Sequence, residues 1–150
     1  MREFATLADL AAEQGNEIGV SSWTDITQER INQFAEVTGD HQWIHTDPER
    51  TERELQMTTI AHGYLTLSLL PAFMSEIFSV TSLKRMINYG ANNVRFVSMV
   101  PVGSRLRGRV GLQKGVLSSS SLRTICDVKI ELEGQTRPVL KAEVITLMYE

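Results

Sequence analysis

The residues best suited to chemistry gather in one polar segment that runs from Thr38 to Pro48. It contains Asp40 and His45, a carboxylate and an imidazole five residues apart, directly after a stretch with helical spacing. Histidine exchanges protons near neutral pH, and a nearby carboxylate can orient the imidazole or share one water molecule with it. The segment is therefore a candidate acid–base site that acts on a bound substrate.

Two other interpretations fit the same residues. One is structural, with Asp40 in an Asx turn and the histidines on the surface. The other is a metal site formed by His41 and His45 with Asp40 or Asp47, because His-x-x-x-His on a helix is a known ligand spacing. A regular helix is disfavoured by three residues of the segment: Gly39, Trp43 and Pro48. We therefore expect no metal, and the structural and acid–base interpretations both remain open.

A second cluster, from Thr58 to Tyr64, immediately precedes an apolar stretch. A helix that begins there presents unpaired N–H groups and the positive end of its dipole. Glycine lets a substrate oxygen approach the backbone closely, so the amide of Gly63 is a candidate oxyanion donor. The alternative is that Gly63 only permits a tight entry into the helix. For His62 a hydrogen bond that holds the turn is expected.

Helices are expected at three places that flank these clusters, and Asp47-Pro48 indicates a turn that opens a further short helical segment, because proline suits the first helical position. Thr6 should cap a short helix that ends near Glu13, and Thr27 should cap a helix that Gly39 terminates. The apolar stretch from Tyr64 to about Phe78 follows helical spacing and is hydrophobic nearly all round, so it should be surrounded by protein. Pro71 inside it predicts a kink or a break.

Strands follow from residue 84 onward. We expect them at about 86–97, 104–117, 119–132 and 136–148, with an earlier one at about 20–26. The tight connections indicate an antiparallel sheet, and helices followed by strands indicate the α+β class. The sequence thus predicts a curved antiparallel sheet wrapped around a long central apolar helix, in one domain that spans residues 1–150.

Composition excludes several classes of protein. The net charge of −3 disfavours nucleic-acid binding, and the single cysteine, Cys126, cannot form an internal disulfide. Low cysteine use is consistent with the cytoplasm. The beginning of the chain is charged and lacks an apolar leader. The uncharged run Leu55–Ser75 is interrupted by polar residues, which suits a buried helix better than a membrane span.

Three motifs, in this order, carry a family resemblance. The first is Phe34-Ala35-x-x-Thr38-Gly39-Asp40-x-x-x-Ile44-His45-x-Asp47-Pro48. The second is Ile60-Ala61-His62-Gly63, and the third is Asn93-Val94-Arg95-Phe96 followed by Val100-Pro101-Val102-Gly103-Ser104-Arg105-Leu106. Together they resemble MaoC-like dehydratases and (R)-specific enoyl-CoA hydratases, and most of all the small single-domain members akin to nodulation protein N.

The resemblance implies a hot-dog fold and a homodimer joined edge to edge, with an acyl-CoA site near the dimer interface. Asp40 and His45 would activate one water for addition to a trans-2-enoyl-CoA, giving a (3R)-hydroxyacyl-CoA, or would catalyse the reverse dehydration. The amide of Gly63 would polarise the thioester carbonyl, and no cofactor would be required. Four further residues would contact substrate: Trp43, His62, Tyr64 and Leu67. Basic residues such as Arg105, Arg107 and Arg109 could meet CoA phosphates.

Two departures from the family pattern keep other functions open. Many members carry Asn-Pro where this chain has Gln42-Trp43, and some carry a serine at the position of Pro71. A shared fold does not guarantee a shared activity. The alternatives are a non-catalytic acyl-thioester binding module and an acyl-CoA thioesterase on the same fold.

Overall fold

The computed structural model describes residues 1–150, and its main feature is a six-stranded antiparallel sheet. Its strands are β2 (Glu17–Val20), β3 (Thr24–Asp25), β5 (Arg85–Phe96), β6 (Arg105–Leu117), β7 (Ser121–Leu132) and β8 (Leu140–Tyr149). The order is β2-β6-β7-β8-β5, and β3 also pairs with β6. The four long strands confirm the prediction, whereas the strand expected at 20–26 is replaced by the two short strands β2 and β3.

Alternating side chains give this sheet one buried face. In β6, Leu106, Gly108 and Val110 are buried, while Arg107 and Arg109 between them are only partly covered. Strand β7 repeats the alternation from Leu122 to Leu132. A period of two is what a strand with one face on the core requires.

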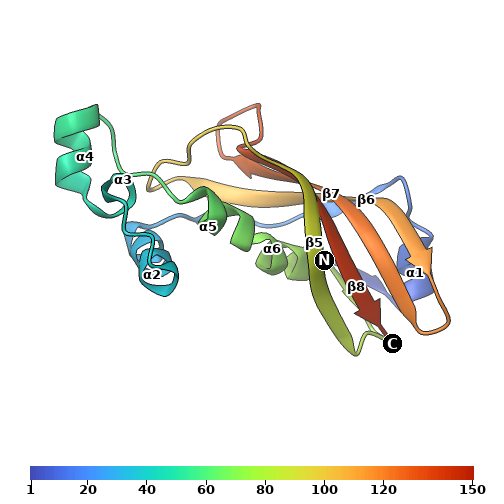
Figure 1. Cartoon of the computed structure of the whole chain (residues 1–150). Coiled ribbons are helices and arrows are strands. Elements are labelled where there is room, and N and C mark those ends of the chain that lie inside the picture. The colour runs from blue at the N-terminus through green and yellow to red at the C-terminus, as the bar shows by residue number, and fades with distance from the viewer.

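The buried face packs against two short helices, α5 (Gly63–Ser68) and α6 (Leu70–Ile77), which run along the sheet in Figure 1. The predicted central helix is present on the sheet but is divided in two, because the regular hydrogen-bond pattern is interrupted at Leu69 while its backbone stays in the right-handed helical region. Pro71 lies in the first turn of α6, where its missing N–H costs nothing, so the break expected at this proline is confirmed. Phe73 of α6 is 1% exposed and lies directly over Gly108.

One end of the molecule is a group of three helices, α2 (Gln28–Thr38), α3 (Trp43–Thr46) and α4 (Pro48–Leu55). Thr27 caps α2, and Gly39 ends it in the left-handed conformation, at a φ of 76°. The single turn α3 forms where a regular helix was disfavoured. The turn is short enough to fit between Gly39 and Pro48, and Asp47 then caps α4 by accepting from Arg50 N.

The opposite end holds α1 (Leu7–Ala11) (Figure 1) and a small parallel sheet that was not predicted. Thr6 forms the expected cap, in a reciprocal pair with Asp9. The small sheet pairs β1 (Arg2–Phe4) with β4 (Phe78–Val80). The apolar core joins both sheets to α5 and α6, and none of the helices is long and apolar enough to cross a membrane.

Strand β5 forms one edge of the large sheet and has no neighbour beyond it. Eleven of its twelve residues are exposed, and only Val94 is partly covered. Its exposed side chains include Met86, Ile87, Tyr89 and Phe96. A long edge strand with apolar side chains on both faces is a ready template for pairing with another chain.

Candidate active site

The imidazole of His45 is the best-placed proton acceptor in the molecule. It lies on α3, is 7% exposed, and its Nδ1 is 2.7 Å from the carbonyl oxygen of Ile60. A carbonyl can only accept, so Nδ1 carries the proton and donates it. The lone pair of Nε2 is then free to take a proton from a substrate or from water.

Neighbouring backbone and side chains fix this geometry. The segment Thr59–Ala61 pairs with residues 100–102, which sets the direction of the Ile60 carbonyl. Gln28, in the first turn of α2, donates from Nε2 to the carbonyl oxygen of His45 at 2.7 Å. The hydroxyl of Thr59 donates to Oε1 of the same amide. Gln28 therefore clamps α3 to the 59–61 segment, a role that the sequence analysis missed.

Asp40 follows the end of α2 and is the more exposed partner, with 51% of its side chain accessible. Its Oδ1 accepts from the amide of Gln42 at 3.4 Å, a weak hydrogen bond. Polar atoms of Asp40, His45 and His62 lie within 4.8 Å of one another. The carboxylate expected beside His45 is thus close to it, although the two form no direct hydrogen bond.

His62 is buried immediately behind His45. It is 2% exposed, and the two rings stack with 3.9 Å between their centroids and 27° between their planes. Its Nε2 donates to the backbone oxygen of Asp40 at 2.9 Å, while its buried Nδ1 has no partner. His62 does not line the cavity described below, so it is not placed for the substrate contact expected of it.

Burial lowers the pKa of His45 below its ordinary value of 6.5, because removal from water disfavours the imidazolium. The hydrogen bond to Ile60 favours the charged form but does not overcome the effect of burial. His45 is therefore neutral at neutral pH, which is the protonation state that a general base needs.

A cavity of about 530 Å³ opens beside His45. Its lining is mostly apolar and comes from α3, the start of α5, and the segment that follows β5: His45, Ile60, Ala61, Gly63, Thr66, Phe96, Val97, Ser98, Met99, Val100 and Val139. Gly63 is the first residue of α5, so its amide N–H has no partner within the helix. The cavity thus brings a base and a free amide donor into one chamber.

The other predicted contact residues lie outside this cavity. Trp43 is partly buried under Arg50, whose guanidinium carbon is 4.5 Å from the ring centroid. Tyr64 is 69% exposed and meets the edge of Phe96. Leu67 lines a separate groove of about 260 Å³ between the helix break and β5. Phe96, which the sequence analysis named only as part of the third motif, lines the chamber with its aromatic ring.

The side chains of Asp40, His45 and His62 are poorly arranged to bind a metal ion. Stacked rings direct their nitrogen lone pairs along nearly parallel planes, whereas a tetrahedral zinc site needs ligands that converge on one point. Each ring also donates from one nitrogen to a backbone carbonyl. His41 is not part of the cluster, and its nearest acid is Glu36, at 3.8 Å. The geometry suits proton transfer better.

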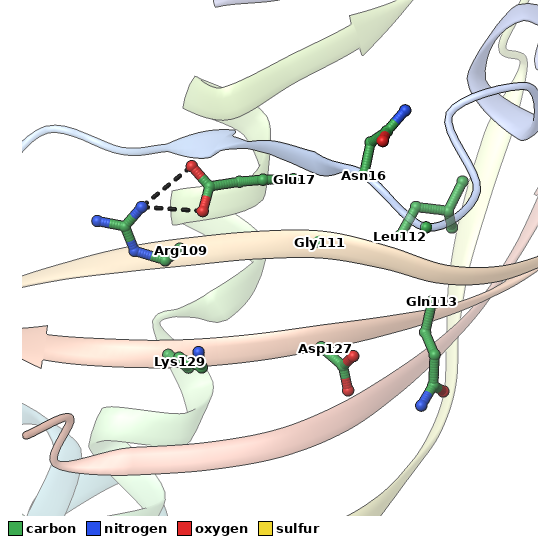
Figure 2. Close-up of a pocket in the computed structure, with 9 residues that line it drawn as sticks. Asn16, Glu17, Arg109, Gly111, Leu112, Gln113, Asp127 and Lys129 are labelled. Carbon is green, nitrogen blue, oxygen red and sulfur yellow. Dashed lines mark hydrogen bonds and ion pairs between the residues drawn. The ribbon is translucent and has the colours of Figure 1, made fainter.

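The arginines of β6 do not face this cavity. Figure 2 shows the guanidinium of Arg109 directed at both carboxylate oxygens of Glu17, at 2.9 and 3.0 Å. Arg109 also binds Glu131 at 2.7 Å, and Arg107 binds the same carboxylate at 2.7 Å. These hydrogen bonds lower the pKa of Glu131 and keep the pair charged. The two arginines are therefore engaged in ion pairs on the outer face of the sheet, away from the candidate site.

Comparison with known proteins places these features in one family. The model of the MaoC like domain matches residues 9–129. The 3-hydroxyacyl-thioester dehydratase Z of Mycobacterium tuberculosis is 47% identical over 148 residues, which is 97% of each chain. Nodulation protein N of Rhizobium leguminosarum bv. viciae is 42% identical, over 95% of this chain and 91% of that protein.

A solved structure shows the same fold. The R-hydratase of Pseudomonas aeruginosa superposes with a TM-score of 0.73 at 22% identity, over 95% of this chain and 84% of that one. The fold is the hot-dog fold, which confirms the α+β prediction of a curved antiparallel sheet that packs on helices.

Proposed function

Because the chain belongs to the family of MaoC-like dehydratases, we propose that it adds water reversibly to a trans-2-enoyl thioester and forms a (3R)-3-hydroxyacyl thioester. The mycobacterial relative is named a dehydratase, which supports this class of reaction. The general assignment is therefore an enzyme that adds water to an acyl thioester or removes water from it. One observation carries the proposal: a buried neutral imidazole with a free Nε2 lies beside Asp40 and opens into the cavity that Gly63 lines.

The proposed mechanism uses one water held between Asp40 and His45. His45 Nε2 takes a proton from the water, and the hydroxyl group bonds to C3 of the substrate. Negative charge moves to the thioester oxygen, where the amide of Gly63 donates a hydrogen bond. His45 then passes this proton to the Asp40 carboxylate, which returns it to C2, so that both side chains recover their starting protonation states. The reverse sequence eliminates water.

We also propose that two copies pair through β5. The support is the exposure of this edge strand on both faces, together with its apolar side chains. Phe96 is both the last residue of β5 and part of the cavity lining, so pairing there would place the site near the interface. The expected ligand is an acyl thioester, which is carried either by CoA or by a carrier protein.

The test combines two assays on purified protein with crotonyl-CoA. The first follows the absorbance of the conjugated enoyl thioester, and the second detects free thiol. Loss of absorbance without thiol release is the expected result. Thiol release would indicate a thioesterase. Binding without turnover, across a panel of longer acyl chains as well, would indicate a binding module.

Variants then assign the roles. We expect His45→Gln and Asp40→Asn each to lower kcat by about 10²–10⁴-fold. The matched control is His41→Gln, because His41 lies in the same segment with 52% of its side chain exposed and does not line the cavity. Wild-type rates in both site variants would refute the assignment of this pair.

A further inference from the structure

We propose that His62 is a positioning residue, a buried ring that holds Asp40 and His45 in one fixed arrangement. The proposal rests on the proposed function of that pair, and it replaces the substrate contact expected of His62. Three features of the described contacts carry it: the two partners that His62 joins, the way His62 is itself held, and the state of its two ring nitrogens.

His62 is the direct link between two residues that come from different elements. Asp40 stands in the loop after α2, whereas His45 lies on α3. His62 donates from Nε2 to the Asp40 backbone oxygen at 2.9 Å and stacks on the His45 ring at 3.9 Å. The other hydrogen bonds of Asp40, from its amide to Thr38 and from Gln42 to its carboxylate, are both 3.4 Å long. The bond from His62 is therefore the shortest tether on Asp40.

The ring of His62 cannot move away from these partners. It contacts two rings, His45 and Phe34 of α2, and the centroid of the Phe34 ring is 5.0 Å away. Its backbone begins α5, which is packed in the core. With 2% exposure, the side chain has no free path to solvent. His62 thus transmits the position of the rigid α5 to both members of the pair.

The two nitrogens of His62 have different surroundings. Nε2 must carry the proton, because it donates to a carbonyl oxygen. The buried Nδ1 has no hydrogen-bond partner, so Nε2 is the nitrogen that ties the ring to the loop of Asp40. His62 therefore covers one face of the His45 ring while its other contact holds the backbone of Asp40.

The remaining surroundings of His45 are simple enough for a clear titration test. Asp40 and His62 are the ionisable side chains that face it. The groups that reach it from α2, from the 59–61 segment and from residues 96–100 are uncharged: Gln28, Thr59, Ile60 and the lining from Phe96 to Val100. Burial and the electrostatic effect of His62 both lower the pKa of His45, so substitution of His62 should raise that pKa.

The first measurement is imidazole ¹⁵N NMR of the wild-type protein, which needs no turnover. The chain has three histidines, and His41→Gln removes the signals of the exposed one. We expect the His62 signals to show a proton on Nε2, because this nitrogen donates to the Asp40 oxygen. A His62 that carries its proton on Nδ1 and none on Nε2 would overturn the proposal whatever the catalytic activity.

Two substitutions then separate the stack from the hydrogen bond. His62→Phe keeps a flat ring over His45 but loses the bond to Asp40, and His62→Gln keeps an amide donor but removes the ring. We expect His62→Phe to lower kcat by about 10- to 100-fold, because Asp40 loses its shortest hydrogen bond. In His62→Gln the acid limb should move to higher pH, because water reaches His45.

A control variant and two separate outcomes distinguish failure of this proposal from failure of the proposed function. His41→Gln should keep the wild-type rate and profile, and thermal melts should show that each variant is folded. If both His62 variants change only the melting temperature, with wild-type kcat and an unmoved pH profile, His62 is merely structural and the proposal fails. If the wild-type protein turns over no thioester, the proposed function fails instead, and the NMR result still decides the state of His62.

Discussion

Gly63 lies so close to Phe96 that a β-carbon on the glycine would come within 2.9 Å of the Phe96 ring. The contact joins the first residue of α5 to the last residue of β5, at the wall of the cavity. Because the N–H of Gly63 is the proposed donor to the thioester oxygen, the same glycine has both a steric and a catalytic reason to lack a side chain.

We therefore expect Gly63→Ala to lower kcat/KM by about 10-fold or more, because the new methyl group moves either the amide or the Phe96 ring. The matched control is Gly111→Ala on the outer face of β6, where the nearest atom is at an ordinary 3.5 Å. Steady-state kinetics on both variants measures this difference in kcat/KM. Equal rates in the two would show that the close approach has no catalytic importance.

A second glycine tests the packing of the core. A β-carbon on Gly108 would lie 2.7 Å from the Phe73 β-carbon, and neither residue has free space to move into. We expect Gly108→Ala to reduce the free energy of unfolding by about 1–3 kcal/mol through overpacking. Urea denaturation measures the change. Gly111→Ala, three residues along the same strand, should unfold at nearly the wild-type midpoint.

Gln28 provides a test of the clamp on α3. Gln28→Leu leaves the His45 carbonyl and the Thr59 hydroxyl without their partner, at a cost of about 1–3 kcal/mol. We expect kcat to fall by about 10-fold as His45 loses its position. Gln33→Leu, on an exposed turn of the same helix, is the control. A stability loss with an unchanged kcat would mean that Gln28 holds the fold but not the base.

The lowered pKa of His45 fixes the sign of two pH effects. Activity should fall as the pH drops through that lowered pKa, so the acid limb of kcat/KM lies below the ordinary value of 6.5. Stability should also begin to fall below about pH 6.5, since the unfolded chain binds the proton before the folded one does. Rates and thermal melts between about pH 5 and 8 measure both. An acid limb above pH 6.5 would contradict the burial of His45.

Local patterns were sufficient for much of the fold. Thr27 and Gly39 bound α2 as expected, and the alternation around Arg107 and Arg109 identified β6 and its buried face. The proximity of Asp40 and His45 was predictable because both belong to one short segment. The helix break was signalled by Pro71, although its position at Leu69 depends on packing.

Features that depend on distant contacts were not predictable. The partners of Gln28 are 17 and 31 residues away, and nothing local distinguishes it from another polar residue of α2. The stacking of His62 on His45 follows from the meeting of α3 with the start of α5. The parallel pairing of β1 with β4 likewise joins residues that are more than seventy positions apart.

The candidate site is divided between two parts of the fold. His45 and Asp40 belong to the helical group at one end, whereas His62 and Gly63 belong to the helix that packs on the sheet. Short helices and loops with much exposed backbone open at lower free energy than a sheet core does. On warming, we expect the enzyme to lose its rate several degrees before the β-sheet signal in circular dichroism changes. The time for which the stored protein keeps its activity is then determined by local opening where the helical group meets the sheet, rather than by global unfolding.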